Sequence, residues 1–370
     1  WMASMKTAIS SRRLRLWSKG QADVADIKTW REIQADYSDT LIVGNGGSVA
    51  VDPCFRYTNL YQQGCEHGFI RPAAQEVFDQ FAKNDRDFER VLYRLWQADY
   101  INQKFELAKI ERDKVRNAYT DVRRALIDTV KDIHPDNAIS DQQGLAHIGR
   151  FMAGFSTVFS LNYDLIVYWA SLNARQANGW RFEDGFTIDK TRATDPKLIK
   201  QCFNASFPAE LEPGVTRVFY PHGNLALYRT QGGEESKLMA DNSDPLSLIT
   251  QYWRDNDGQP LFVCEGSSES KIAAINSSRY LSHVYQHELP RPKDSMTIYG
   301  WSIGKQDRHI LEQLALSPCR RAAVSVFAGN KTPKKIESER VHMEKMLNDA
   351  GIKEVVFFDA TSAGCWNHAD

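Results

Sequence analysis

Cysteine is scarce in this sequence, and its cysteines stand far apart. No two of them form a Cys-x-x-Cys pair, which argues against a structural zinc ribbon, and so low a count in 370 residues argues against a disulfide framework. The pattern predicts no metal site and a reducing, cytoplasmic setting. The six cysteines are Cys54, Cys65, Cys202, Cys264, Cys319 and Cys365.

The sequence also lacks an excess of charge of either sign and a long apolar run. Its 46 basic and 47 acidic residues give a formal net charge of -1, so the chain as a whole has no field that would draw it to nucleic acid or to an anionic membrane. No apolar run is long enough to span a bilayer. For the one basic run, from Ser11 to Lys19, we favour a solvated surface over contact with a partner or nucleic acid.

Glycine is concentrated between Asp39 and Val51. A short apolar run ends at Gly44, two more glycines follow at Gly46 and Gly47, and the sequence then turns apolar again, which predicts a strand, a tight turn and the start of a helix. Such a turn lets backbone N–H groups approach a phosphate. The spacing departs from the full Gly-x-Gly-x-x-Gly fingerprint, and glycine turns also join strands to helices for packing reasons. Nucleotide binding and tight packing both remain open.

Short β-prone runs alternate with helical periodicity along most of the chain. This alternation predicts an α/β fold with a Rossmann-like, doubly wound, mainly parallel sheet. Between Arg71 and His134 apolar residues recur at helical spacing, which predicts a helical insertion after the first strand. We expect strands at 40–43, 156–161, 218–220, 261–264, 296–299, 322–327 and 355–358, a hairpin over 225–239, and helices over 24–37, 142–153, 165–172, 307–316 and 336–347.

These elements divide the chain into four parts. We expect an N-terminal segment and helix over 1–38, a Rossmann-type domain over 39–70 and 135–360, a helical insertion module over 71–134 and a C-terminal tail over 361–370. The structural interpretation of the aromatic residues in the insertion is that they pack in a hydrophobic core.

Small or polar residues follow four of the predicted strands. They are Gly44 to Ser48, Asn162 with Asp164, His222 with Gly223, and Gly300 to Ser302. Because ligands bind outside the carboxyl ends of the strands in a doubly wound sheet, we expect the four groups to converge on one ligand. The alternatives are that Asn162 and Asp164 only cap the following helix, and that His222 is an ordinary turn histidine.

Two further features have structural interpretations. His283 and His287 are four residues apart, but Val284 stands where a zinc protease motif has glutamate, so we interpret the pair as structural. The segment from Glu265 to Lys271 either contacts a cofactor or caps a helix, and we favour the cap.

The order of these motifs resembles the sirtuin-like NAD-binding superfamily. More narrowly, it resembles the prokaryotic branch of that superfamily, which lacks a zinc ribbon. Many members of this branch are NAD-cleaving effectors of antiphage defence. The resemblance spans about residues 40 to 330 and rests on Gly44-Asn45-Gly46-Gly47-Ser48, Leu161-Asn162-Tyr163-Asp164, His222-Gly223, Tyr299-Gly300-Trp301-Ser302 and Asp307-Arg308-His309-Ile310.

The resemblance implies roles for these residues toward NAD. Gly44, Gly46 and Ser48 would line the pyrophosphate, Asn162 and Asp164 would lie at the nicotinamide end, His222 would face the nicotinamide ribose, and Gly300 and Ser302 would touch the other ribose or the phosphates. The cofactor-binding set further includes Asn45, Gly47, Tyr163, Gly223, Trp301 and Asp307.

The sequence departs from sirtuin deacylases in three ways. It lacks their two zinc-binding cysteine pairs, it has Asn45 where they have a small residue, and its helical insertion has no counterpart in them. Peptide deacylation and ADP-ribosyl transfer are therefore the less favoured expectations.

The residue types suit cleavage of NAD without a metal. Nicotinamide leaves as a neutral group, so its glycosidic bond breaks without a general acid, unlike ordinary glycosides with their two carboxylates. His222 could act as base toward a ribose hydroxyl or water, Asn162 could hold that water or the ribose, and Asp164 could orient the nicotinamide amide.

We therefore expect an NAD glycohydrolase with catalytic Asn162, His222 and Asp164, and the resemblance alone implies a role in antiphage defence by NAD depletion. The alternative is a non-hydrolytic sensor of NAD or ADP-ribose. A homo-oligomer or a defence partner protein is expected, and the helices between Arg71 and His134 are the candidate contact, because long amphipathic helices often bury a face against another subunit.

Overall fold

The computed structural model describes residues 27–55, 61, 64–80, 88–106, 108–133, 142–188, 198–204, 212–229, 234–240, 246–249, 252, 259–263 and 268–369. The basic run at 11–19 and the first part of the segment before Lys271, residues 265–267, lie outside the described residues.

Within the described residues, eight strands form one parallel sheet, in the order β1-β13-β12-β11-β2-β3-β7-β4. Apart from the edge strands β1 and β4, this is the order 3-2-1-4-5-6 of doubly wound nucleotide-binding folds, with its reversal between β2 and β11. The strands are β1 (Ile27–Lys28), β2 (Thr40–Val43), β3 (Thr157–Ser160), β4 (Arg181–Glu183), β7 (Val215–Phe219), β11 (Ser295–Tyr299), β12 (Arg321–Val326) and β13 (Glu354–Asp359). The predicted α/β fold class is confirmed.

The sheet register places the functional strand ends level with one another. Val43, the last residue of β2, pairs with Ser160 on one side and with Tyr299 on the other. The side chains of β2 are fully buried, as expected for a central strand covered on both faces. The segments that follow β2, β3 and β11 therefore leave the sheet at one edge.

Helices follow most of these strands in the chain. They are α3 (Asn45–Val51), α8 (Gln142–Ala153), α9 (Ile166–Asn178), α11 (Ser268–Asn276), α12 (Arg279–His283), α13 (Arg308–Ala315) and α14 (Pro333–Asp349). The short turns η1 (Pro53–Phe55), η3 (Val284–Glu288) and η4 (Lys305–Asp307) connect them. No helix in the described part of the chain combines the length and apolar character needed to cross a membrane.

The helix predicted over 24–37 is wrong for most of its length. Its described part begins with β1, and the helix that follows, α2, covers only Trp30–Ile33. Thr29 caps α2 through its N–H, which donates to Glu32 Oε2 at 2.6 Å. Trp30 and Ile33 reach the core from this single turn, so the helical spacing of the buried residues was real but the helix was short. Because β1 precedes it, the strand at 40–43 is the second in the chain.

A second sheet in the described residues is antiparallel. Its order is β10 (Gln259–Phe262), β8 (Gly223–Arg229), β9 (Glu235–Ala240), β6 (Leu198–Phe203) and β5 (Phe186–Ile188). The predicted hairpin is the pair β8 and β9. The strand predicted at 261–264 contributes to this sheet as β10, whereas the alternation of strands and helices had suggested the parallel sheet.

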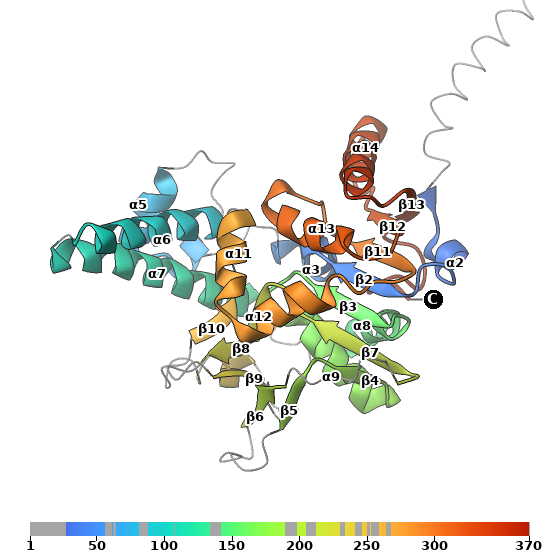
Figure 1. Ribbon diagram of the computed structural model, residues 1–370, viewed down its shortest axis with the longest axis horizontal. Helices are drawn as coiled ribbons and strands as arrows, with labels where there is room; N and C mark the ends of the chain where they lie inside the picture. Colours follow the sequence, from blue (N-terminus) through green and yellow to red (C-terminus); the bar gives the residue numbers. More distant parts are fainter. Residues whose placement is uncertain are drawn as a thin grey trace, which may run out of the picture.

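The described residues between η1 and α8 are mainly helical. Helices α5 (Pro72–Asp79), α6 (Phe88–Lys104) and α7 (Lys109–Ile133) extend away from the parallel sheet, on the side opposite to α2 (Figure 1). Tyr61, Phe78 and Phe88 are buried and pack against one another, with the ring centroids of Tyr61 and Phe78 4.7 Å apart and those of Phe78 and Phe88 5.3 Å apart. Phe78 and Phe88 therefore pack as core, as expected, whereas Phe105 is 75% exposed and does not.

Candidate functional site

The glycine turn after β2 lies directly against the turn after β11. The Gly46 N–H donates to the Gly300 carbonyl at 2.7 Å, and the Gly44 N–H donates to the Tyr299 carbonyl at 2.9 Å. A Cβ on Gly300, whose φ is +67°, would lie 2.3 Å from the Gly47 nitrogen. These contacts show that packing alone requires glycine at both turns, and that two N–H groups predicted to face a pyrophosphate, those of Gly44 and Gly46, are bonded to Tyr299 and Gly300 instead.

A cavity of about 840 Å³ opens beside these two turns, at the point where the strand order reverses. Four residues of the predicted cofactor set line it: Gly46, Gly300, Trp301 and Ser302. Helix α14 forms the facing wall with side chains that include Lys335 and His342. This volume is in the range of sites for small ligands and cofactors.

Asn162, Ser48 and Asp164 form a buried hydrogen-bond network behind the glycine turn. The Asn162 Nδ2 amide donates to Ser48 Oγ at 2.8 Å and to the Gly44 carbonyl at 3.0 Å. Ser48 Oγ in turn donates to Asp164 Oδ2. The three side chains are between 0 and 7% exposed. The predicted convergence of the first two strand ends is therefore present in the structure.

Asp164 also caps a helix. Its Oδ1 accepts the Ile166 N–H at 3.0 Å, at the start of α9. Burial raises the pKa of Asp164, against the opposing effect of the hydrogen bonds from Ser48 and Ile166. Asp164 therefore accepts a hydrogen bond from the first turn of α9, as the capping alternative predicted, and it also accepts one from Ser48. Asn162 does not follow that alternative, because its amide donates to the glycine turn.

His222 follows β7, and neighbouring segments contact both its side chain and its backbone. Its Nδ1 lies 3.4 Å from the Leu161 carbonyl, and its backbone carbonyl accepts the Val263 N–H at 2.8 Å. Gly223 has φ +71°, and a Cβ there would lie 2.1 Å from the Leu261 carbonyl oxygen. Strand β10 therefore locks the backbone at this turn, which is a tighter environment than an ordinary surface turn.

A second histidine completes the polar cluster. His309 Nε2 on α13 lies 2.9 Å from His222 Nε2, and Ser268 Oγ lies 3.3 Å from His309 Nδ1. Because the Leu161 carbonyl can only accept, the proton of His222 is on Nδ1 and its Nε2 carries a lone pair. The His309 Nε2–H then donates to that lone pair. Ser268 Oγ, which contacts His309 Nδ1, also donates to the Gln306 carbonyl at 3.3 Å.

Both imidazoles are neutral in this environment. Burial, and next the charge of Lys271, lower the pKa of His222 to about 4, although Asp307 and the Leu161 carbonyl act in the opposite direction. Burial and then His222 lower the pKa of His309 as well. Neutral His222 with a lone pair on Nε2 has the protonation state of a general base.

Asp307 connects the cluster to the cavity. Its Oδ1 accepts from Lys271 Nζ at 3.0 Å and its Oδ2 from Trp301 Nε1 at 3.3 Å. Burial alone would raise the pKa of Asp307, but the charge and hydrogen bond of Lys271 together with the charges of His222 and His309 outweigh burial, and the pKa lies below its usual value. Lys271 is itself 1% exposed, so α11, which includes the described part of the segment from Glu265 to Lys271, contributes an ion pair to the cluster.

Other residues of the predicted set make structural contacts. The Asn45 amide donates to the Phe55 carbonyl at 3.2 Å, and the Gly47 carbonyl accepts from Trp366 Nε1 at 2.9 Å. The Tyr163 ring lies against Phe262, with centroids 5.9 Å apart. His309 and Lys271 were missed as site residues. The only sequence signal for His309 was its place in the motif from Asp307 to Ile310.

The described residues contain no group of three His, Cys, Asp or Glu side chains placed to hold a metal ion. His283 and His287 lie with ring centroids 5.1 Å apart, and His283 Nε2 contacts Glu288 Oε1 at 3.2 Å. That pair belongs to the packing between α12 and η3.

Comparisons with known proteins show the family of this chain and include a weak likeness to a solved structure. No curated protein matches the chain. A solved structure entitled "Structural Basis for the Mechanism and Regulation of Sir2 Enzymes" is 11% identical with a TM-score of 0.31, over 86% of this chain and 94% of that one. A family model described as a domain of unknown function, DUF4917, matches residues 41–366. The chain therefore belongs to the DUF4917 family.

Proposed function

We propose that this protein cleaves NAD to nicotinamide and ADP-ribose. The observation that carries the proposal is the position of His222: a neutral imidazole with its basic nitrogen fixed on Nε2, beside the Asn162 network and at the edge of the sheet where β2, β3 and β7 end. The motif resemblance supplies NAD as the substrate.

The chemistry follows from the groups present. The bond between the nicotinamide nitrogen and the ribose C1′ breaks, its electron pair goes to the ring nitrogen, and nicotinamide leaves neutral. Water then forms a new bond to C1′, and its proton passes to His222 Nε2, directly or through a ribose hydroxyl. Asn162, already rigid through Ser48 and Gly44, would hold the water or the ribose.

Substrate entry requires a local change of partners. His222 and Asn162 are 4% and 7% exposed, and His309 occupies the His222 Nε2. A ribose hydroxyl would take the place of the His309 N–H at that nitrogen. The cavity beside Trp301 and Ser302 would receive the rest of the dinucleotide.

The proposed biological setting rests on the resemblance alone. It is NAD depletion in antiphage defence, in a cytoplasmic setting, with activity controlled by assembly. Support for an assembly surface comes from the residues around the turn between α6 and α7. Ile101 near the end of α6, Phe105 just after it and Ile110 at the start of α7 are between 52 and 75% exposed. We propose self-association of this chain through that turn.

The proposed activity is tested by nicotinamide release from NAD with three variants. Asn162→Ala and His222→Ala are expected to lower the rate at least about 100-fold, the usual contribution of a positioned acid or base group. His147→Ala, a histidine on α8 outside the cluster, serves as the matched control and is expected to retain the wild-type rate. Circular dichroism and thermal melting check that all variants fold. Turnover retained in both Asn162→Ala and His222→Ala would overturn the residue assignment, and binding of NAD without cleavage would favour the sensor.

A further inference from the structure

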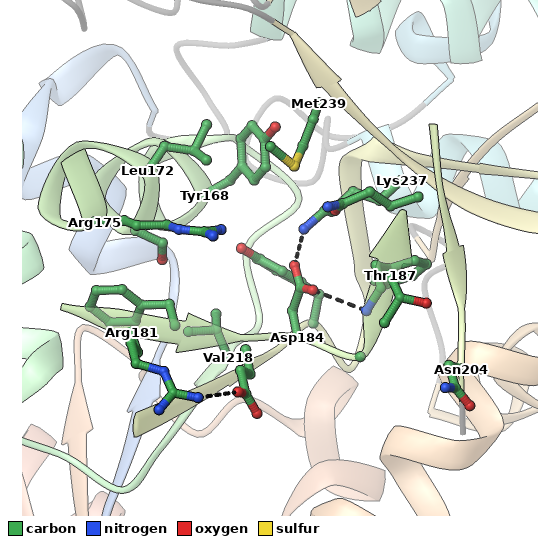
Figure 2. Close-up of a pocket in the computed structure, with 17 residues that line it drawn as sticks. Tyr168, Leu172, Arg175, Arg181, Asp184, Thr187, Asn204, Val218, Lys237 and Met239 are labelled. Atoms are coloured by element: carbon green, nitrogen blue, oxygen red, sulfur yellow. Dashed lines mark hydrogen bonds and ion pairs between the residues drawn. The ribbon is translucent and has the colours of Figure 1, made fainter. Parts of the chain in front are cut away.

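A second cavity lies between α9 and the antiparallel sheet, away from the candidate site (Figure 2). Its volume is about 640 Å³, enough for a small organic ligand. Residues from α9, β6, β7 and β9 and from the turn between β4 and β5 line it, and none of the residues assigned above to NAD is among them.

One positive charge in this cavity is left without a counterion. Lys237 pairs with Asp184, and Arg181 pairs with Glu212 at 2.7 Å and with Glu183 at 3.3 Å. The guanidinium of Arg175 extends from α9 toward the Asp184–Lys237 pair, and within the described residues it has no ion pair or hydrogen bond (Figure 2). The residues that line the cavity include three cations, Arg175, Arg181 and Lys237, and two carboxylates, Glu183 and Asp184, while Glu212 lies outside the lining. The lining alone therefore carries one excess positive charge, and the exposed Arg175 is the cation that can pair with an anionic ligand.

One buried acceptor in the same cavity is also unsatisfied. Gln201 is 7% exposed, and its Oε1 accepts no hydrogen bond from the described residues. Gln201 pairs with Lys237 across β6 and β9, so both side chains stand on the face that lines the cavity. An unpaired buried acceptor costs about 1–3 kcal/mol, and a ligand N–H donor would remove that cost.

The remaining walls suit a planar ring. The rings of Tyr168 and Phe186 both face Lys237 Nζ, each with its centroid 5.7 Å from that atom. The Tyr168 hydroxyl donates to the Leu238 carbonyl at 3.1 Å, which fixes its ring. Leu172 and Met239 add apolar surface. Rigid aromatic and apolar walls with few polar groups are typical of sites for small molecules.

We propose that this cavity binds a small organic anion whose planar ring carries an N–H donor, the chemistry of a nucleoside monophosphate. The phosphate pairs with Arg175, and an N–H group of the base donates to Gln201 Oε1. The proposal does not depend on NAD cleavage, because it uses a different cavity and different residues.

Isothermal titration of the full chain with AMP tests this site. Adenosine lacks the anion and ribose 5-phosphate lacks the base, so each is expected to bind at least tenfold more weakly than AMP. Arg175→Ala removes the charge, and Gln201→Leu removes the acceptor at nearly constant volume. Both are expected to weaken one AMP binding event at least tenfold, whereas Arg124→Ala, an exposed arginine on α7, leaves it unchanged.

A thermal melt separates loss of binding from loss of folding. Because Gln201→Leu removes an unpaired buried acceptor, its melting temperature is expected to equal or exceed that of the wild type while AMP binding falls. The proposal is overturned if AMP does not bind in the millimolar range, if adenosine or ribose 5-phosphate binds as tightly as AMP, or if every AMP binding event survives either cavity variant.

Discussion

At the scale of residues, the role proposed for His222 depends on its contact with His309. The proton on His222 Nδ1 is fixed by the Leu161 carbonyl, and this leaves Nε2 free to accept from His309. A sequence can show that two histidines exist, but it cannot show that residues 87 positions apart share a hydrogen bond. The roles predicted for Asn162 and Asp164 depended on the same kind of distant contact, and the structure supplies it through Ser48.

This pair predicts a specific dependence of stability on pH. The folded-state pKa of His222, about 4, lies below the value of about 6.5 for an unfolded histidine, so the unfolded chain takes up protons first as the pH falls. The contribution of neutral His222 to the free energy of unfolding is fully present above about pH 6.5 and is lost as the pH falls from about 6.5 to 4. The loss due to His222 is on the order of 3 kcal/mol.

His309→Gln tests the contribution of the second imidazole. Glutamine retains an N–H donor for His222 Nε2 but does not titrate. Urea unfolding at pH 7.5 and 5 is expected to show a smaller loss of stability in this variant than in the wild type. Equal losses in the two proteins would contradict the assignment of buried, neutral imidazoles.

At the scale of elements, the glycine turns allow the segments that follow β2 and β11 to pack directly against each other. The sequence predicted both strands and the turn after each, because apolar runs and glycines are local signals. It could not decide between phosphate binding and packing, since the contact that requires glycine lies between Gly46 and Gly300. The same limit explains α2, where helical spacing over 24–37 did not show that one turn was enough to bury Trp30 and Ile33.

Gly300→Ala and Gly179→Ala separate backbone strain from steric contact. Both glycines have nearly the same φ, +67° and +68°, but a Cβ on Gly179 meets no atom within 4 Å. Each variant carries roughly 1–2 kcal/mol of backbone strain, and only Gly300→Ala adds a clash with the Gly47 nitrogen, at about 1–3 kcal/mol. Chemical denaturation should therefore show the larger loss for Gly300→Ala. Equal losses of unfolding free energy in the two variants would mean that the turn at Gly300 can move away from the turn at Gly47 without loss of stability.

At the scale of the whole molecule, the mainly parallel, doubly wound character of the eight-stranded sheet in the described residues was within reach of the sequence. Its edge strands β1 and β4 and the second sheet were not. Alternating strands and helices predict a doubly wound sheet and place its ligand where the order reverses. Antiparallel pairing of β5, β6 and β10 with a hairpin depends on contacts that no local pattern specifies. The cavity beside Arg175 lies against that sheet, and it was equally invisible in the sequence.

The helices beyond the sheet carry a prediction about assembly. Replacing Ile101 and Phe105 together by Asp places charge on the exposed apolar side chains of the turn between α6 and α7. If this turn joins two copies of the chain, light scattering should show a smaller species for the double variant than for the wild type. Val341→Asp, at an exposed apolar position on α14, is the matched control. The same mass for wild type and double variant would refute the assembly surface.

The central claim is that the site after β2, β3 and β7 hydrolyses NAD. The most direct measurement is the simultaneous quantification of nicotinamide and ADP-ribose from NAD incubated with the wild type over a range of protein concentrations. The account predicts equal amounts of the two products. Nicotinamide released without free ADP-ribose would indicate transfer to another acceptor, and the absence of both products at every concentration would contradict the account.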